Sequence, residues 1–214
     1  MEKIMIRRER SEDYRAVEEL HRRAFWNLNV PGCDEHYLAH VLREHADFIP
    51  ELDLVAELEG RVVANVMYTK SRLVDGAGNE QEILTFGPIG VAPEFQRRGI
   101  GKALLEETFI RARQMGFKAI VIFGDPGNYV SIGFRSGMRS NVCLPGDVFP
   151  MALLVKELEP GFLDGRRYYF HESTAFEIEK EEAEAFDREF EPMERKVLPS
   201  QEVFFIHSHS VMRG

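Results

Sequence analysis

The spacing of apolar residues predicts a chain of alternating helices and strands. From Tyr14 to Phe25, and again across residues 34–45, apolar residues recur every three or four positions, as on the buried face of an amphipathic helix. Ser11, followed by two acidic residues, is expected to cap the first of these helices. Alternating or continuous apolar runs predict strands at residues 4–6, 52–58, 62–68 and 83–91.

The strand over residues 83–91 carries three residues that disturb a regular ladder, Gly87, Pro88 and Gly90. Proline has no N–H to give to a neighbouring strand. We therefore expect this strand to bulge or to splay away from one neighbour.

The rest of the chain continues the pattern and changes composition at Pro160-Gly161. Before that point we expect a long helix, a buried strand, a short helical segment and two strands, at residues 99–116, 118–123, 128–132, 140–144 and 151–156. After it we expect a strand, an acidic helix and a late apolar strand, at residues 166–170, 180–190 and 203–207. The sequence thus predicts a main domain, residues 1–160, and an acidic C-terminal extension, residues 161–214, that packs on it.

Composition narrows the class of protein without revealing its chemistry. The chain has 214 residues, 44% of them hydrophobic, which is enough for a globular core. The formal charge of −9 disfavours nucleic acid as a partner and is compatible with a cationic substrate such as an amine. The apolar runs are too short to span a bilayer, and the first eight residues lack the apolar core of a secretory signal. Cys33 and Cys143 are far apart, so we expect reduced cysteines in a cytoplasmic protein.

The most informative segment runs from Val91 to Leu104, where a strand leads through a glycine-containing loop into a helix. The first turn of a helix exposes unpaired N–H groups and carries the positive end of the helix dipole. Gly99 and Gly101 leave room for a phosphate to approach, and cationic side chains flank them. These properties predict a binding loop for a diphosphate.

Three known phosphate-binding motifs could account for such a loop. A P-loop is excluded, because Gln96 stands where its first glycine belongs and Ala103 follows Lys102. A dinucleotide fingerprint is disfavoured by Leu104 and by the hairpin pattern that precedes the loop. The third pattern, Gln/Arg-x-x-Gly-x-Gly/Ala, is satisfied in full by Gln96-Arg97-Arg98-Gly99-Ile100-Gly101.

Together with Gly87–Pro93 before it and Gly124–Phe134 after it, this hexapeptide resembles the GNAT superfamily of acetyl-CoA-dependent N-acetyltransferases. The resemblance covers roughly residues 3–157. It implies an α/β (α+β) fold: a mixed, mostly antiparallel central sheet with splayed strands, flanked by helices, to which the C-terminal extension adds a small α/β element. It also implies acetyl-CoA as the cosubstrate, with no metal.

The resemblance assigns roles to particular residues. A backbone N–H of Ile89 or Val91 would polarise the thioester carbonyl, and Tyr129 would protonate the departing CoA thiolate. Asn128 is a further candidate contact of pantetheine. The cofactor-binding set is Ile89, Gly90, Val91, Gln96, Arg97, Arg98, Gly99, Ile100, Gly101, Lys102 and Asn128.

The general base stays open. Some members of the superfamily carry a glutamate on the fourth strand where this chain has Thr85, while Glu82, Asp34 and Glu35 are alternative carboxylates. A helical face formed by His36, His40 and Glu44 has a spacing compatible with metal ligands, but we interpret it as the polar face of an amphipathic helix, and His207 and His209 as the end of a strand.

The leading hypothesis is therefore an N-acetyltransferase that acts on a primary amine of a small molecule or peptide. The amine would attack the thioester directly in a ternary complex, because no cysteine lies in the motif region to carry an acetyl group. The alternatives are a non-catalytic acyl-CoA-binding or regulatory module and a protein-interaction role for the acidic extension. The resemblance also admits a homodimer.

Overall fold

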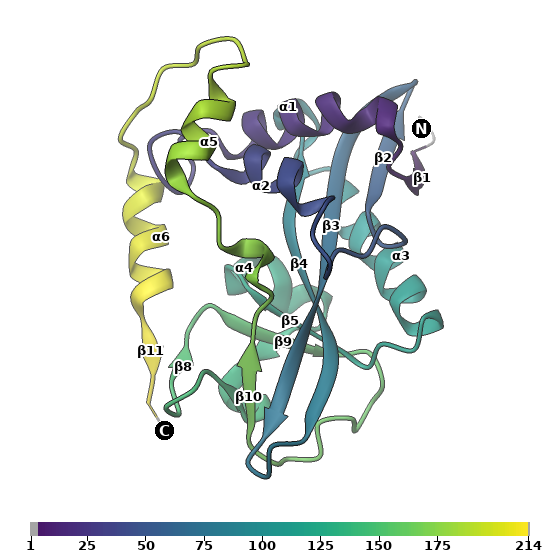
Figure 1. Ribbon diagram of the computed structural model, residues 1–214, viewed down its shortest axis with the longest axis vertical. Helices are drawn as coiled ribbons and strands as arrows, with labels where there is room; N and C mark the ends of the chain where they lie inside the picture. The colour runs from purple at the N-terminus through teal and green to yellow at the C-terminus, as the bar shows by residue number, and fades with distance from the viewer. Residues whose placement is uncertain (1–3, 214) are drawn as a thin grey trace. The chain divides into compact units, whose positions relative to one another are not determined.

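The computed structural model describes residues 4–213 and divides them into two compact units. The first unit contains the chain up to Tyr68, Gly87–Thr108 and Thr174–Glu202. The second contains Thr69–Phe86, Phe109–Ser173 and the residues from Val203 onward. Four of the described elements pass from one unit to the other: β3 (Arg61–Asp75), β4 (Glu80–Val91), α3 (Ile100–Gln114) and α6 (Pro199–His209) (Figure 1).

In the first unit, two helices lie against antiparallel strands. The helices are α1 (Tyr14–Phe25) and α2 (Glu35–Leu42), and the strands are β1 (Met5–Arg8), β2 (Leu54–Leu58) and the first part of β3. Strand β2 pairs with β1 on one side and with β3 on the other, with an irregularity between Ala56 and Glu57. Residues Ala39, Leu42 and Met67 form a buried cluster beneath α2.

The second unit holds most of the remaining strands. Strand β5 (Ala119–Phe123) runs parallel to β4 at Leu84 and Ile120 and antiparallel to β9 (Leu153–Glu157). The short elements of the second unit are α4 (Pro126–Tyr129), β6 (Arg135–Ser136), β7 (Val142–Cys143), β8 (Phe149–Pro150), β10 (Tyr168–His171) and β11 (Val211–Met212). The predicted fold class, a mixed and mostly antiparallel sheet flanked by helices, is confirmed.

The C-terminal extension contributes to both units. Strand β10 pairs with β3, and its Tyr168 and Phe170 complete a buried cluster that includes Leu73, Ile83 and Val121. The next residues, with Ala175 buried and Phe176 packed against it, join the cluster beneath α2 in the first unit. The boundary between residues 160 and 161 stays a prediction.

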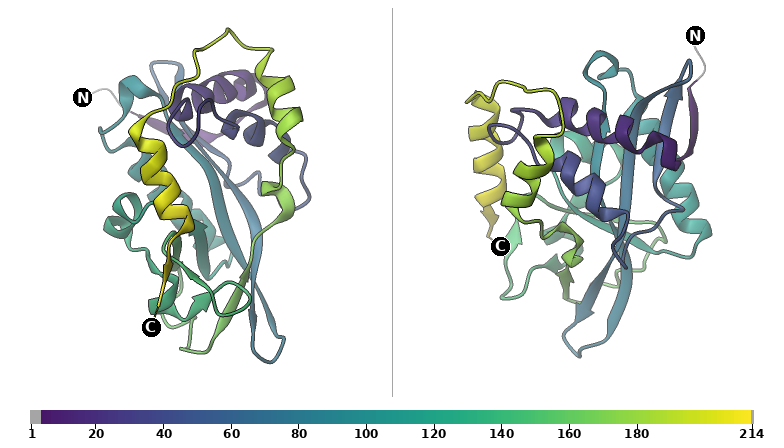
Figure 2. Two further views of the ribbon diagram at one scale, coloured as in Figure 1. Left: turned by 90° about the vertical axis from the view of Figure 1, so that its left-hand side faces the viewer. Right: turned by 45° about the horizontal axis from the view of Figure 1, so that its top comes forward.

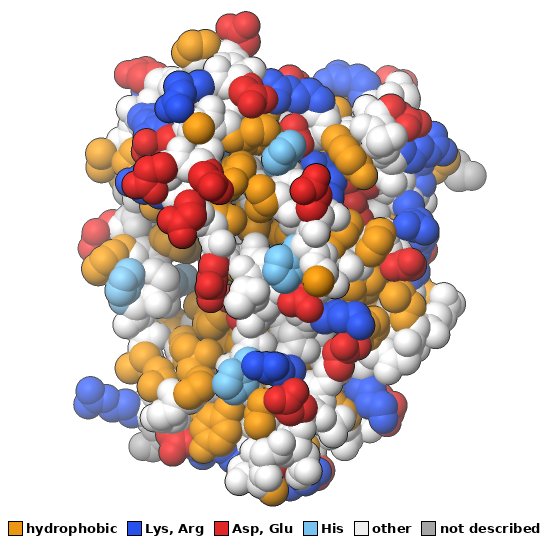
Figure 3. All heavy atoms as spheres, in the orientation of Figure 1, with side chains coloured by type: hydrophobic (Ala, Val, Ile, Leu, Met, Phe, Trp, Pro, Cys, Tyr) orange, Lys and Arg blue, Asp and Glu red, His pale blue; other side chains and the backbone are white. Residues whose placement is uncertain are grey.

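Helix α5 (Lys180–Asp187) lies beside α1 and α2, as both views of Figure 2 show. Ala183, Phe186 and Phe190 are buried, whereas Glu181 and Glu182 are exposed. The acidic side chains gather over α5 in the upper left of Figure 3. The predicted amphipathic character of the acidic helix is confirmed, since its phenylalanines face the first unit and its glutamates face solvent.

Two local predictions are wrong. Residues 203–207 are not a strand but part of helix α6 (Pro199–His209), so His207 and His209 lie on a helix. Ser11 begins a short 3-10 segment instead of capping α1, and Asp13 precedes the helix without capping it because its carboxylate accepts bonds from Arg7 and from the Arg10 N–H.

Candidate active site

The predicted diphosphate loop is formed within the first unit. Strand β4 ends at Val91, a 3-10 turn covers Pro93–Phe95, and α3 begins at Ile100. Arg97 and Gly99 have left-handed backbone conformations, with φ of 62° and 82°. No atom lies within 4 Å of where a Gly99 Cβ would stand, so the backbone there is open to a ligand.

The loop presents the donors that an anion requires. The first N–H bonded within the helix is that of Ala103, which donates to Gly99 O at 3.0 Å. The N–H groups of Ile100, Gly101 and Lys102 precede it and have no carbonyl one turn earlier in the helix. Because α3 extends for 15 residues, its dipole places partial positive charge at these N–H groups.

Cationic side chains surround the loop, and its one carboxylate is neutralised. Arg97, Arg98 and Lys102 are exposed. Glu94 accepts a bond from Arg23 at 2.8 Å and lies 3.7 Å from Arg61. The Gln96 side chain braces the loop by donating to Val91 O at 3.1 Å. The loop therefore offers positive charge to an anion in a protein that is acidic as a whole.

The last residues of β4 orient backbone groups and side chains in a defined way. Ala92 N–H donates to Val63 O of β3 at 2.9 Å. Because N–H directions alternate along a strand, those of Ile89 and Val91 point away from β3. A Cβ on Gly90 would stand 2.7 Å from His21 Nδ1, so only glycine permits α1 to pack this closely. Gly90 is thus a packing residue that leaves only its backbone for a ligand.

A buried polar chain supports α1 against this strand, and sequence reasoning missed it. His21 Nε2 lies 2.8 Å from Asn65 Oδ1, and the Asn65 amide donates to Asp53 at 2.9 Å and to Leu54 O at 3.1 Å. Since the Asn65 amide is the donor to Asp53 and Leu54, its oxygen accepts from His21. Burial lowers the pKa of His21 to about 4, so the imidazole is neutral at pH 7.

Tyr129 is placed in the second unit at the end of α4. Its ring folds back over Gly124, where a Cβ would stand 2.6 Å from Tyr129 Cε2, and packs beside Phe86 and Phe134 at centroid distances of 5.6 and 5.8 Å. Burial, with a contribution from Asp125, raises the pKa of Tyr129 to about 12. Its hydroxyl is protonated and has no hydrogen-bond partner within residues 4–213, so it is free to donate.

The other predicted residues lie apart from one another. Asn128 is exposed beside Tyr129. Of the candidate bases, Glu82 lies 3.2 Å from Lys70 on the exposed part of the hairpin. Glu35 accepts bonds from the Asp34 N–H and, at 3.3 Å, from Asn29, and burial raises the pKa of both carboxyls. Asp34 and Glu35 lie in the first unit, whereas Tyr129 lies in the second. Glu82 also lies in the second unit, but it is already paired with Lys70.

A cysteine, a histidine and an aspartate meet in the first unit. Cys33 Sγ lies 3.6 Å from His36 Nδ1, and His36 Nε2 lies 3.2 Å from Asp187 Oδ1, which also accepts from Arg22 at 2.7 Å. Burial raises the pKa of the Cys33 thiol and lowers that of His36 to about 4. A neutral thiol beside a weak base is not a nucleophile, so this array serves to dock α5. His36 is buried rather than on a polar helix face, which corrects the sequence interpretation.

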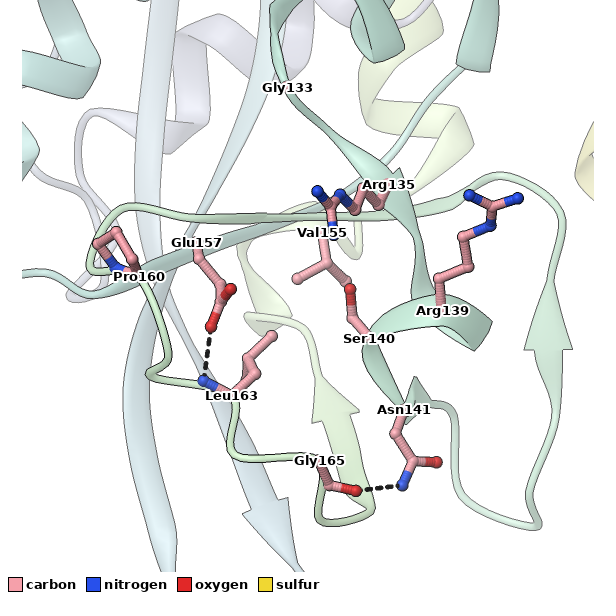
Figure 4. Close-up of a pocket in the computed structure, with 10 residues that line it drawn as sticks. All are labelled: Gly133, Arg135, Arg139, Ser140, Asn141, Val155, Glu157, Pro160, Leu163 and Gly165. Atoms are coloured by element: carbon pink, nitrogen blue, oxygen red, sulfur yellow. Dashed lines mark hydrogen bonds between the residues drawn. The ribbon is translucent and has the colours of Figure 1, made fainter.

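A separate hollow of about 500 Å³ lies in the second unit beside β6 and β9 (Figure 4). Arg135, Arg139, Asn141 and Glu157 line it, and Asn141 and Glu157 are engaged in hydrogen bonds with Gly165 O and Leu163 N–H. None of the predicted site residues lines this hollow.

Clustered metal ligands and long apolar helices are both missing from the part of the chain that the structure describes. Within residues 4–213, no group of three or more His, Cys, Asp or Glu side chains could hold a metal ion. Among the helices of the same residues, none combines the length and apolarity needed to cross a membrane.

The mixed sheet, the flanking helices and the glycine loop are the features by which the chain can be compared with known families. The profile of the acetyltransferase (GNAT) family matches residues 14–135, from the start of α1 to the beginning of β6. This match spans more than half of the chain and contains the whole diphosphate loop.

Known proteins agree with that class. The uncharacterized N-acetyltransferase YhbS of Escherichia coli strain K12 is 30% identical over 120 residues, which cover 50% of this chain and 69% of YhbS. The crystal structure of Escherichia coli YhbS with CoA has a TM-score of 0.71 at 23% identity and covers 83% of this chain and 94% of that one. A Brucella melitensis GNAT acetyltransferase with acetyl-CoA has a TM-score of 0.63 at 23% identity, covering 82% and 99%. The chain belongs to the acetyltransferase (GNAT) family.

Proposed function

We propose that this protein transfers the acetyl group of acetyl-CoA to a primary amine of a small molecule or peptide. The observation that carries the proposal is the loop at Gly99, where an open backbone, N–H groups without a partner in the helix and three exposed cationic side chains suit the binding of a diphosphate. The CoA and acetyl-CoA complexes of the structural neighbours support this choice of cosubstrate. The free, buried cysteines support a reducing compartment such as the cytoplasm.

The cosubstrate would be held by groups that the structure already orients. Arg97, Arg98, Lys102 and the N–H groups of residues 100–102 would bind its diphosphate, while the Gln96 side chain would hold the loop in place through its bond to Val91 O. The N–H groups of Ile89 and Val91 point away from β3 and would bond the pantetheine arm or the thioester oxygen. Asn128 would contact the arm beside Tyr129.

Tyr129 would supply the proton that the leaving thiolate needs. With a pKa of about 12 against about 8.5 for a thiol, the transfer is uphill by about 3.5 units, or about 5 kcal/mol. Reference values alone, about 10 and about 8.5, would give about 2 kcal/mol. Burial of the CoA sulfur beside the Tyr129 ring would raise the pKa of the thiol, so the gap between the thiol pKa and the Tyr129 pKa would be smaller.

The test measures CoA release with acetyl-CoA and a panel of primary amines. The wild type should turn over at least one amine, and Tyr129→Phe should lower kcat by about 10²-fold, as expected for loss of a general acid, with acetyl-CoA affinity retained. Unchanged kcat in Tyr129→Phe would remove Tyr129 from the mechanism. Tight acetyl-CoA binding without turnover of any amine would instead establish a non-catalytic acyl-CoA-binding module.

A further inference from the structure

The hollow beside β6 and β9 in the second unit has the size of a small-molecule site. Its volume is about 500 Å³, within the range of about 300–1,000 Å³ that such sites occupy. Two cationic side chains, Arg135 and Arg139, contribute to its wall. Three apolar side chains add carbon surface, those of Val155, Pro160 and Leu163. A wall of this kind suits a ligand that carries a charged group on a carbon skeleton.

The pairing of β6 with β9 fixes the face of the sheet on which Arg135 lies. Arg135 stands opposite Val155 in this antiparallel pair. Residues that stand opposite each other share a face of the sheet, so Arg135 lies on the side of Val155, which belongs to a buried cluster. Because β6 is the last strand of the sheet order, Arg135 borders the hollow from the edge of the sheet.

A tight 3-10 turn over Gly137–Ser140 holds the backbone of Arg139 at the same wall. The Ser136 hydroxyl caps this turn by accepting from the Arg139 N–H at 3.4 Å. A Cβ on Gly137 would stand 2.5 Å from Val142 O, so only glycine lets the turn pack this closely. Since the backbone is already ordered, a ligand that binds Arg139 would have only the side chain to immobilise.

Both guanidinium groups of the hollow are available to an anion. Within residues 4–213, neither pairs with a carboxylate or donates to a carbonyl, and the Ser140 hydroxyl also has no hydrogen-bond partner. By contrast, Arg166 and Arg167 of the same unit pair with Asp164 and Asp147. A guanidinium presents a planar fork of N–H groups that matches the oxygens of a phosphate or carboxylate. The hollow therefore offers two such forks and one hydroxyl donor.

A carboxylate lines the other side of the hollow. Figure 4 shows Glu157 on one side and Arg139 on the other, with Val155 between them. Glu157 Oε1 accepts from the Leu163 N–H at 2.7 Å, and the carboxylate has lone pairs for a further donor. An ionised carboxylate cannot donate, so this side favours a ligand group that donates, such as a hydroxyl.

The hollow is separate from the ring of Tyr129. A Cβ on Gly124 would stand 2.6 Å from Tyr129 Cε2 and 3.5 Å from Ile122 Cδ1, so the ring lies on the side of Ile122. Val121, the preceding residue of β5, belongs to the buried cluster that contains Val155. Adjacent strand residues point to opposite faces. Tyr129 and the hollow therefore lie on opposite faces of β5 and β9.

We propose that this hollow binds a small phosphate ester that carries hydroxyl groups, at a site separate from that of acetyl-CoA. A phosphate monoester has a charge of about −1.5 to −2 at pH 7, which Arg135 and Arg139 together balance. The hydroxyls donate to Glu157, and the carbon skeleton lies against Val155 and Leu163. The net charge of −9 disfavours a larger polyanion such as nucleic acid.

Binding of the ester would connect two segments of the second unit. The turn after β6 supplies Arg139, and the loop between β9 and β10 supplies Pro160 and Leu163. A ligand that binds only the folded state stabilises that state in proportion to the logarithm of its concentration above Kd. The stability of the second unit would therefore rise with the concentration of the ester.

The experiment measures Kd by calorimetry on the full chain, with glycerol 3-phosphate as the probe and inorganic phosphate, glycerol and glutarate as comparisons. Glycerol 3-phosphate should bind about tenfold more tightly than inorganic phosphate or glutarate, and glycerol should not bind. Arg135→Gln and Arg139→Gln should each weaken binding of the ester about tenfold. Arg72→Gln, at an exposed arginine of the same unit, should match the wild type.

Two further measurements test the chemical class and the separateness of the site. Glu157→Gln should reduce the advantage of glycerol 3-phosphate over inorganic phosphate to about twofold, because the stronger acceptor for the hydroxyls is lost. Saturating acetyl-CoA should leave the Kd of glycerol 3-phosphate unchanged. None of these measurements requires turnover, so failure of the proposed acetyltransferase function would not affect the result.

Several outcomes would overturn the proposal. Absence of glycerol 3-phosphate binding would show that the hollow is not a site for such esters. Displacement of the probe by acetyl-CoA would place it at the cosubstrate site, and equal losses in Arg139→Gln and Arg72→Gln would reveal an unspecific effect of surface charge. Equal affinity for glycerol 3-phosphate and glutarate would refute the preference for a phosphate ester. If Arg135→Gln does not fold, Arg139→Gln decides, since Arg139 is exposed and lies outside the strand.

Discussion

Replacing Gly124 with alanine tests whether the position of the Tyr129 hydroxyl matters for catalysis. Gly124 does not have a left-handed conformation, so alanine fits its backbone. The added Cβ would stand 2.6 Å from Tyr129 Cε2, whereas carbon atoms normally approach to about 3.5 Å. The ring must therefore move by about 1 Å, a displacement that costs about 10²-fold in rate when it affects a catalytic group.

The assay is CoA release at saturating acetyl-CoA, with Tyr129→Phe and the double variant measured beside Gly124→Ala. If the alanine acts by displacing the hydroxyl, its effect should disappear once the hydroxyl is gone, so the double variant should match Tyr129→Phe. In free energy, Gly124→Ala should raise the barrier by about 2.7 kcal/mol alone and by about zero in the Tyr129→Phe background.

Gly76 provides the matched control, because it also lacks a left-handed conformation and no atom lies within 4 Å of where its Cβ would stand. Gly76→Ala should retain wild-type kcat. Additive losses in the double variant, with wild-type stability in urea, would refute the reasoning, because the effect of the alanine would then be independent of the hydroxyl.

Three further outcomes are expected. Burial holds the pKa of His21 at about 4 against about 6.5 in the unfolded chain, so the unfolded state binds more protons between these values. The resulting stability is full above pH 6.5 and falls by about 3 kcal/mol below pH 4; a urea-unfolding series that stays flat from pH 7.5 to 4 would contradict this. Gly99→Ala should strain a backbone with φ of 82° by about 1 kcal/mol and weaken acetyl-CoA binding about fivefold by calorimetry. Phe186→Ala removes a ring that is 8% exposed and stacks on His36, so urea unfolding should show a loss of about 3 kcal/mol, and a loss below 1 kcal/mol would argue against docking by α5.

The elements that local pattern determines were predicted well. Helix α3 and strand β5 follow from periodicity and apolar runs, and the glycine loop follows from the conformations that Gly99 and its neighbours must adopt. Helix α6 was missed because a run of four consecutive apolar residues has no period that separates helix from strand. Pro199, which favours the first turn of a helix, was the available signal.

The features that depend on distant contacts could not be predicted. Asp13 looks like part of a helix start, but its pairing with Arg7 depends on how β1 folds back. Burial of His36 depends on Phe186, which no local pattern connects with it.

The distribution of the C-terminal extension between the two units has a consequence for how the protein is made. Phe170 belongs to one buried cluster and Ala175 to the other, and both are synthesised after residue 160. A ribosome adds about 5–20 residues per second, so a nascent chain that stops at residue 160 holds two unfinished cores. Leu73 and Met67, fully buried in the finished protein, would then lack part of their cover. Neither core closes until the extension has left the ribosome, and a stalled or truncated chain presents apolar surface to chaperones and proteases.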